Sequence, residues 1–402
     1  MAIDKLLPGV ERISTPTAVP LPETDTSRTV VIEPYHVDLL PEYSYVSREY
    51  LISGVAAGES YCTRILLRCP ADATKFTGFV VEEPSHLWGG TSIWRHINRW
   101  LMCNVDSQAP SALEKIKNVD PERYKDMHFM PVPLSSEFQE NIPFVAEILS
   151  AASYVLRSGQ LGLKATRIVL SGLSQTGGLT RRFVTHSVRH LRLPGVASGG
   201  AALPDLPGVK VIELLGEAEF PSVRFPCGVS GQQKATTHRR PDSDSFRLYE
   251  VAGKPHRGSR YASALDMERS FSNSFIYHAV FEAMERWTGE GVSPPPSVTI
   301  QTIGSTDEIV RDEHGKAVGG VRIVHTDDLL FRIVVATSKG RLKWYWRSEV
   351  PFDQDKLQSV YGSVAQYRLL TGKAIQDQVN AGFLLPGDAE TRRLETIETV
   401  TF

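Results

Sequence analysis

Residues Thr166 to Val184 read T-R-I-V-L-S-G-L-S-Q-T-G-G-L-T-R-R-F-V, and this stretch decides the fold. Arg167 to Leu170 is a short apolar run with β-branched residues, which predicts a buried parallel strand. A turn of small residues around Ser174 follows, and a helix is expected from Leu179 onward. A serine at a strand-to-helix turn between small residues is typical of a nucleophile elbow, in which the hydroxyl stands clear of the sheet. We therefore predict that Ser174 is a nucleophile.

The turn departs from the usual elbow at one position. The usual motif has glycine two residues after the serine, whereas this chain has Thr176 there and Gly177 one residue later. A plain glycine-rich turn after a strand is the alternative interpretation. If the turn is an elbow, the backbone N–H of Gln175 lies at the helix N-terminus. It would then stabilise negative charge that develops on a carbonyl oxygen.

Length and composition exclude several classes of protein. The 402 residues suffice for one large α/β domain with insertions or for two ordinary domains. A formal net charge of −2 gives no basic face for nucleic acid. The four cysteines lack zinc-ligand spacing, which indicates buried free thiols, and no dinucleotide glycine pattern follows the first strand. We therefore predict no metal, no cofactor and no nucleic-acid partner.

The chain also lacks the signals of membrane insertion and secretion. No apolar run reaches the roughly 18 residues that a spanning helix requires. Residues 1–12 lack a long apolar segment followed by a small-residue cleavage site. We therefore predict no membrane partner and a cytoplasmic location.

Strands alternate with helices over most of the chain. Strands are expected at 45–53, 61–68, 76–83, 101–105, 167–170, 195–203, 209–215 and 245–252, and helices at 138–158 and 270–287. The passage between 105 and 138 is expected to be long and irregular. The first strands suit an antiparallel edge, and the later alternation predicts a mostly parallel sheet with helices on both faces. Functional groups then belong at the C-terminal ends of the strands.

The remaining segments complete the predicted domain organisation. Residues 1–29 are expected to form an extended surface arm, and residues 30–402 a single domain. Segments 84–137 and 288–402 would cap or flank the pocket. Within the second of these we expect a hairpin at 308–323, strands within 328–347, and helices at 354–370 and 373–382.

Two glutamates and a histidine follow later strands, as a serine nucleophile requires. A base must take the proton of the serine, and an acid must orient that base. Glu217 and Glu219 follow the strand at 209–215, and His256 follows the strand at 245–252. The order of serine, acid and histidine is that of the α/β hydrolases. We predict His256 as the base and Glu219 as the orienting acid, with Glu217 as the alternative acid.

A second oxyanion donor is expected in the loop after the strand at 76–83. In α/β hydrolases this loop supplies a backbone N–H opposite the one that follows the nucleophile. Here the donor would be the N–H of Ser85 or His86. An exposed loop histidine without a role is the alternative for His86.

Several motifs resemble those of one family. The elbow, G-L-S-Q-T-G, is similar to the G-x-S-Q-x-G of a family known as the alpha/beta hydrolase domain family. The resemblance covers most of the chain and implies an α/β-hydrolase fold. It implies that Ser174 and His256 take the family's nucleophile and base positions, and that Glu217 and Glu219 fit its acidic pair. The other similar blocks are V-V-E-E-P (Val80–Pro84), D-P-E-R-Y (Asp120–Tyr124), E-V-A-G-K-P-H (Glu250–His256), A-V-G-G-V-R (Ala317–Arg322) and A-G-F-L-L-P-G-D (Ala381–Asp388).

The predicted activity follows from this constellation. We expect a serine hydrolase that cleaves a small-molecule ester, thioester or lactone, with His256 as the base and an acyl-enzyme on Ser174. Two alternatives remain open. The same triad would also serve an acyltransferase, and the same fold would also serve a non-catalytic ligand-binding protein. Substrate identity and oligomeric state are left open.

Overall fold

The computed structural model describes the chain in segments that form two compact units. The N-terminal unit comprises residues 1–211 with 225–231, and the C-terminal unit comprises residues 212–224 with 232–402. The predicted arm and single-domain boundaries stay predictions. The described residues are 15–31, 39–86, 100–129, 142–173, 175–187, 195–197, 203, 208–220, 235–254, 274–304, 306–322, 331–334, 348–351 and 354–397.

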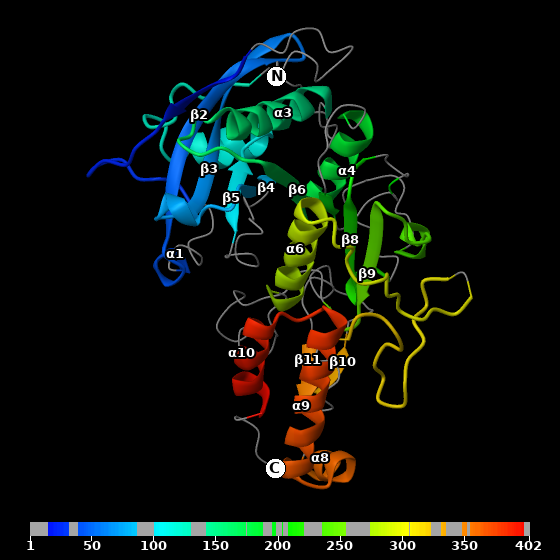
Figure 1. Ribbon diagram of the computed structural model, residues 1–402. Helices are drawn as coiled ribbons and strands as arrows, with labels where there is room; N and C mark the ends of the chain where they lie inside the picture. Colours follow the sequence, from blue (N-terminus) through cyan, green and yellow to red (C-terminus); the bar gives the residue numbers. More distant parts are fainter. Residues whose placement is uncertain are drawn as a thin grey trace. The chain divides into compact units, whose positions relative to one another are not determined.

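The N-terminal unit is built on one sheet (Figure 1). Its strands are β1 (Thr17–Pro20), β2 (Tyr45–Ala56), β3 (Glu59–Pro70), β4 (Phe79–Pro84), β5 (Leu101–Val105), β6 (Arg167–Gly172) and β7 (Gly195–Ala197). They lie in the order β1-β2-β3-β5-β4-β6-β7. The pairs β1–β2, β2–β3 and β3–β5 are antiparallel, and the pairs β4–β5, β4–β6 and β6–β7 are parallel. The predicted antiparallel edge that leads into a parallel sheet is therefore confirmed.

The parallel strands are buried, as their apolar runs predict. Every residue of β4 and β5 is buried, and so is every residue of β6 after Arg167. A parallel sheet is covered on both faces, so its strands read as continuous rather than alternating apolar runs. Each buried Val, Leu or Ile side chain contributes roughly 1.5–3 kcal/mol relative to exposure. The core of this unit is therefore centred on β4, β5 and β6.

Two long helices of the N-terminal unit pack against this sheet, and the short helix α1 (Leu39–Glu42) packs against β2. The two long helices are α3 (Ile142–Ser158) and α4 (Gln175–Ser187). Phe144, Ile148 and Ala152 recur at helical spacing on α3 and are buried, and α3 packs against β2. The helix predicted over 138–158 is confirmed from Ile142 onward. α4 begins directly after the turn at Ser174 and packs against β6 and β7.

The prediction of a wholly irregular passage after β5 is wrong. A π-helix, η4 (Pro110–Lys117), begins five residues after β5 ends. The carbonyl oxygen of Gln108 accepts the N–H of Ala112 at 3.0 Å. Pro110 opens the helix, where a missing N–H costs no hydrogen bond. The helix buries Ala112 and Ile116, but it is too short for its sequence to show a clear apolar period.

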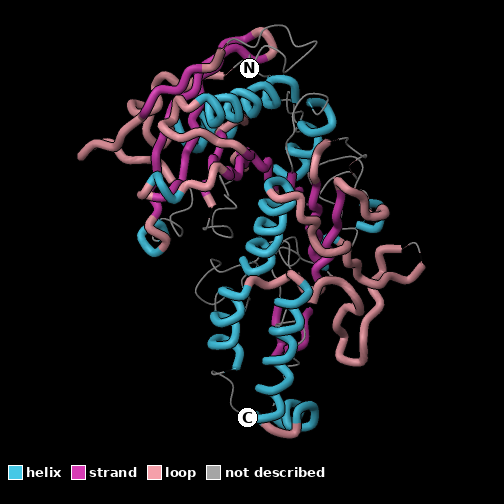
Figure 2. The backbone as a smooth tube through the Cα atoms, in the orientation of Figure 1, coloured by secondary structure: helices cyan, strands magenta, loops and turns pink. Residues whose placement is uncertain are grey.

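The C-terminal unit combines a strand pair, a hairpin and helices. β8 and β9 are neighbours in a sheet, and β10 and β11 pair antiparallel. The predicted hairpin at 308–323 is confirmed by the antiparallel bridge between Arg311 and Ala317. Figure 2 draws this segment as loop, because its strand-like pairing consists of single bridges. The elements are β8 (Val211–Gly216), η5 (Glu217–Glu219), η6 (Ala235–His238), β9 (Phe246–Val251), α6 (Ser274–Gly289), β10 (Phe331–Val334), β11 (Ser348–Pro351), α8 (Gln354–Tyr361), α9 (Val364–Ala381) and α10 (Pro386–Ile397).

The two C-terminal helices predicted at 354–370 and 373–382 are wrong in number and bounds. Three helices, α8, α9 and α10, occupy this stretch. Gly362 has a φ of +70°, and the Ser363 side chain accepts the N–H of Gln366, so one helix ends and the next begins there. Gly382 has a φ of +80° and ends α9 in the same way. A break at one glycine inside a polar helical pattern is easily missed from spacing alone.

Two further predictions concern cysteines and membranes. Cys62, Cys69 and Cys103 are buried free thiols as predicted, and Cys227 lies outside the described residues. In the described part of the chain, no helix has both the length and the hydropathy to cross a bilayer.

Candidate active site

The predicted site residues fall on both units, and two of them lie outside the described residues. Ser174 and His256 are these two. The predicted donors Gln175, Ser85 and His86 belong to the N-terminal unit. The acids Glu217 and Glu219 belong to the C-terminal unit. The pocket predicted beneath segments 84–137 and 288–402 stays a prediction.

β6 and α4 approach each other closely on the two sides of Ser174. β6 ends at Gly172, and α4 begins at Gln175. A Cβ atom on Gly172 would lie 2.3 Å from the carbonyl oxygen of Thr176 and 2.8 Å from the backbone nitrogen of Gly177. Only glycine fits at this approach of strand to helix. The glycine two residues before Ser174 is therefore a steric requirement.

Thr176, the departure from the usual elbow, closes the turn. Its hydroxyl accepts the N–H of Leu173 at 2.9 Å and donates to the carbonyl oxygen of Leu173 at 2.9 Å. Its own N–H donates to the same oxygen at 3.2 Å. The side chain is buried, so water does not compete for these bonds. Threonine at this position therefore holds together the two ends of the turn that contains Ser174.

A buried glutamine, Gln108, connects the first residue of α4 to the loop after β4. Its Nε2 donates to the carbonyl oxygen of Ser85 at 2.8 Å. Its Oε1 accepts from Nε2 of Gln175 at 2.7 Å. Gln108 is 3% exposed. The residue after Ser174 and the loop that carries both alternative oxyanion donors are thus joined by one side chain.

Ser85 and His86 are the two alternative oxyanion donors in this loop, and the N–H of Ser85 already makes a hydrogen bond within the sheet. The N–H of Ser85 donates to the carbonyl oxygen of Val105 at 2.8 Å, which extends the β4–β5 pairing by one residue. A backbone N–H that is spent on the sheet does not serve a substrate. Of the two predicted donors, the N–H of Ser85 is therefore excluded, and the N–H of His86 is the one that we retain.

Asp106 anchors the segment that carries Gln108. Its carboxylate accepts Nε of Arg64 at 2.6 Å and the hydroxyl of Ser111 at 3.1 Å. Its carbonyl oxygen accepts the hydroxyl of Thr63 at 2.5 Å. Burial alone would lower the pKa of Arg64, but Asp106 and Glu49 together raise it above its ordinary value. Arg64 therefore stays charged, and the backbone before Gln108 is held on both sides.

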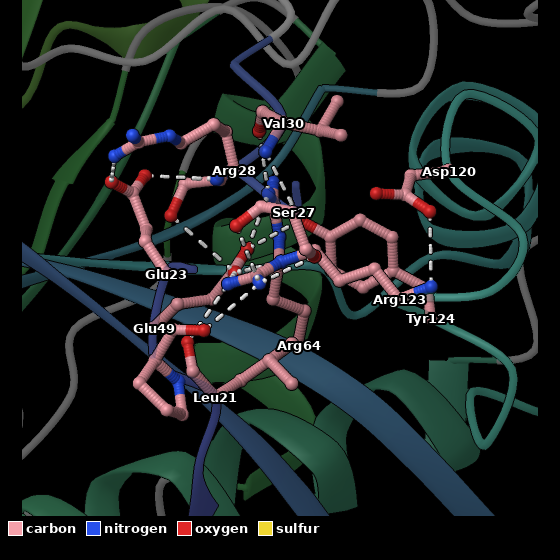
Figure 3. Close-up of polar contacts among 12 residues, drawn as sticks. Leu21, Glu23, Ser27, Arg28, Val30, Glu49, Arg64, Asp120, Arg123 and Tyr124 are labelled. Carbon is pink, nitrogen blue, oxygen red and sulfur yellow. Dashed lines mark hydrogen bonds and ion pairs between the residues drawn. The ribbon is translucent and has the colours of Figure 1, made fainter. Parts of the chain in front are cut away.

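Glu49 accepts several hydrogen bonds and extends this network from Arg64 to Arg123 and Tyr124 (Figure 3). Its carboxylate accepts Nη1 of Arg64 at 3.0 Å, Nη2 of Arg123 at 2.5 Å and the hydroxyl of Tyr124 at 2.7 Å. Arg123 also donates to the carbonyl oxygens of Leu21 and Pro22. Buried charges are tolerated when they are paired and hydrogen-bonded in this way. The D-P-E-R-Y block thus fastens the N-terminal segment to β2.

In the C-terminal unit, Glu217 is committed to structure. It is 1% exposed, and its Oε2 accepts the N–H of Gly253 at 2.7 Å. Its Oε1 lies 2.8 Å from Nη2 of Arg311, an ion-pair contact without hydrogen-bond alignment. Both oxygens therefore hold the end of β8 to the end of β9 and to the hairpin.

Glu219 has a different environment, although it lies on the same short turn. It is half-buried, and its charge acts on the ammonium group of Lys254. Burial lowers the pKa of Lys254, and the carboxylate of Glu219 partly offsets this shift. A Cβ on Gly216 would lie 2.7 Å from the carbonyl oxygen of Lys254, so glycine is needed where the turn begins. This agrees with the predicted start of the turn.

A third glutamate at this strand, Glu213, is also structural. Its Oε2 lies 2.9 Å from Nδ1 of His238, and both side chains are buried. Sequence reasoning missed this pair, and it also missed Gln108 and Lys254. Gln108 follows the end of β5 by three residues. The rule that sites gather at the C-terminal ends of parallel strands would have pointed to it.

Comparisons with known proteins identify the family. A sequence model of the family described as "Alpha/beta hydrolase domain" matches residues 17–393. This match confirms the predicted α/β-hydrolase fold. No curated protein matches the chain.

Solved structures with some likeness to the chain include one assigned as a dienelactone hydrolase and two esterases. A protein assigned as a dienelactone hydrolase from Klebsiella pneumoniae is 15% identical over 51% of this chain and 85% of its own, with a TM-score of 0.29. The esterase Est22 is 13% identical over 44% of this chain and 65% of its own, with a TM-score of 0.28. A bacterial brefeldin A esterase is 14% identical over 44% and 42%, with a TM-score of 0.25. The chain thus spans less than two thirds of the last two proteins, and likenesses this weak carry no argument.

Proposed function

Because the chain belongs to the alpha/beta hydrolase domain family, we propose that it is a serine hydrolase of small-molecule carboxylic esters, thioesters or lactones. The observation that carries the proposal is the turn between β6 and α4. Gly172 and Thr176 hold that turn tight around the position of Ser174, and Gln108 ties the turn to the loop after β4. A merely glycine-rich turn would need neither the steric fit nor the buried connection.

The reaction proceeds through an acyl-enzyme. His256 takes the proton of the Ser174 hydroxyl, and Oγ attacks the carbonyl carbon of the substrate. The oxyanion accepts hydrogen bonds from the N–H groups of Gln175 and His86. His256 then donates its proton to the leaving alcohol or thiol. Water, activated by the same histidine, cleaves the acyl group from Ser174.

Glu219 is the acid that orients His256 in this scheme. The commitment of Glu217 to Gly253 and Arg311 supports this choice, because an acid that already serves the backbone and a cation has little capacity for the histidine. Glu213 is paired with His238. Glu219 is the other carboxylate on this turn, and its charge acts on Lys254.

Covalent labelling of Ser174 tests the proposal without knowledge of the substrate. The intact mass after treatment with a fluorophosphonate should show one adduct per chain, and Ser174→Ala should show none. Ser171→Ala is the matched control, because Ser171 lies on the same strand end and its buried hydroxyl has no hydrogen-bond partner among the described residues. An adduct that persists in Ser174→Ala would contradict the mechanism.

A further inference from the structure

The Gln108 amide makes three hydrogen bonds, one to the carbonyl oxygen of Ser85 and two to the side chain of Gln175, and they bear on both oxyanion donors of the proposed reaction. A carbonyl oxygen only accepts hydrogen bonds, so the end of the Gln108 amide that lies 2.8 Å from the Ser85 oxygen is its NH₂ group. The other end is then Oε1, which accepts from Nε2 of Gln175 at 2.7 Å. The carbonyl oxygen of Ser85 therefore requires a donor at this position, and the Gln108 amide supplies it while also donating to and accepting from the amide of Gln175.

The bond to Ser85 determines the direction of the N–H of His86. The carbonyl oxygen of Ser85 and the N–H of His86 belong to the same peptide group, and that peptide is trans. In a planar trans peptide the C=O and N–H bonds point in opposite directions. Since Gln108 holds the carbonyl oxygen on its own side, the N–H of His86 points away from Gln108. A donor to the carbonyl also polarises the peptide and strengthens that N–H as a donor.

The bond to Gln175 acts on the other donor. Gln175 is the first residue of α4, and its side chain is held by the same amide. Fixing this side chain fixes the first residue of the helix and hence its backbone N–H. The bridge is itself rigid, because Gln108 is buried, its carbonyl oxygen accepts the N–H of Ala112, and Asp106 anchors the preceding backbone.

We infer that Gln108 is a positioning residue that aims the N–H groups of His86 and Gln175 at the oxyanion. The inference rests on the proposed function. Gln108 touches neither the substrate nor the reacting atoms in this scheme, and it acts through the two peptide groups that it holds. Its removal should therefore weaken transition-state stabilisation more than substrate binding.

The test compares Gln108→Met with Gln160→Met. Methionine keeps the length of the side chain and removes all three of its hydrogen bonds. Gln160 is the matched control because its amide also joins two backbone groups of the N-terminal unit, the N–H of Ala18 at 3.1 Å and the carbonyl oxygen of Pro16 at 3.3 Å. The readouts are the rate constant of fluorophosphonate labelling at Ser174, and kcat and KM with p-nitrophenyl acetate.

We expect Gln108→Met to lower kcat and the labelling rate by about 10- to 100-fold, below the loss of roughly 100- to 1000-fold for a deleted oxyanion donor. KM should change by less than about threefold, and one site per chain should still be labelled. Gln160→Met should leave both rates at the wild-type value.

A second pair of variants keeps the inference testable if Gln108→Met folds poorly. Gln175→Met removes the two bonds between Gln108 and Gln175 and leaves the bond to Ser85, so it should lower the rates less than Gln108→Met. The double variant should be no slower than Gln108→Met, because all of these bonds belong to one bridge.

Wild-type rates in well-folded Gln108→Met, or additive losses in the double variant, would overturn the inference. If Ser174 remains the labelled residue in that case, the proposed function stands and only the role of Gln108 fails. If Ser174 is not labelled in the wild type, the proposed function fails.

Discussion

Glu217 and Glu219 lie two residues apart on one turn, yet the structure uses them differently. Glu217 is buried, and both of its oxygens contact groups of the same unit, the N–H of Gly253 and the guanidinium of Arg311. Glu219 is half-buried and acts electrostatically on Lys254. The difference teaches that the partners of a carboxylate, and not its residue type or its place after a strand, decide whether it is committed to holding the fold.

The N-terminal unit repeats this contrast with two buried glutamates. Glu49 on β2 is surrounded by donors, among them Arg64 and Arg123. Glu82 on β4 accepts one bond, from the hydroxyl of Ser153 at 2.5 Å, and its Oε1 has no hydrogen-bond partner among the described residues. Burial raises the pKa of Glu82 to about 8. One glutamate is therefore held by arginine and tyrosine donors, and the other is held mainly in its neutral form near pH 7.

The largest expected effect is on turnover, and it distinguishes Glu219 from Glu217. Glu219→Gln should lower turnover by up to about four orders of magnitude, because the orienting acid stabilises the histidine in its charged form. Glu217→Gln should change turnover by less than about tenfold and should instead lower the free energy of unfolding by roughly 1–3 kcal/mol. Turnover and urea unfolding of both variants check this. The reverse ranking of turnover in folded variants would make Glu217 the acid.

The next largest effect concerns Glu49. Glu49→Ala should lower the free energy of unfolding by roughly 3–5 kcal/mol, because it removes the carboxylate partner of the buried Arg123 and leaves Arg64 with Asp106 alone. Urea denaturation of the purified variant measures this loss. Glu59→Ala is the control, since Glu59 is an exposed glutamate on β3 and should change stability by about 0.5 kcal/mol or less. Equal stability of the two variants would contradict a structural role for Glu49.

The smallest effect concerns Glu82, and it depends on pH. The folded protein keeps the proton of Glu82 up to a pKa of about 8, whereas the unfolded chain releases it near the ordinary value of 4.5. Glu82 therefore makes stability fall as pH rises through this window. Glu82→Gln removes this dependence. The free energy of unfolding of the variant, relative to that of the wild type, should therefore rise by on the order of 3 kcal/mol from pH 5 to pH 9. Urea denaturation of both proteins at pH 5 and at pH 9 measures this rise. The same difference between variant and wild type at both pH values would exclude a raised pKa of Glu82.

Much of the fold was predictable from short stretches of sequence. The apolar run before Ser174 predicted β6, and the helical spacing of Phe144, Ile148 and Ala152 predicted α3. These features depend on neighbours within one or two turns of chain. The break at Gly362 was missed because the surrounding helical pattern is polar and continues on both sides of it.

The sequence by itself determined the family, the buried strands β4, β5 and β6, and the glycine two residues before Ser174, because these depend on residues that are close along the chain. Only the tertiary structure decided that Glu217 is spent on Gly253 and Arg311, and that Gln108 joins Ser85 to Gln175. Gln108 and Gln175 are 67 residues apart, and their contact follows from the pairing of β4 with both β5 and β6. No local pattern marks such a contact, because the sheet order that creates it is a property of the whole unit.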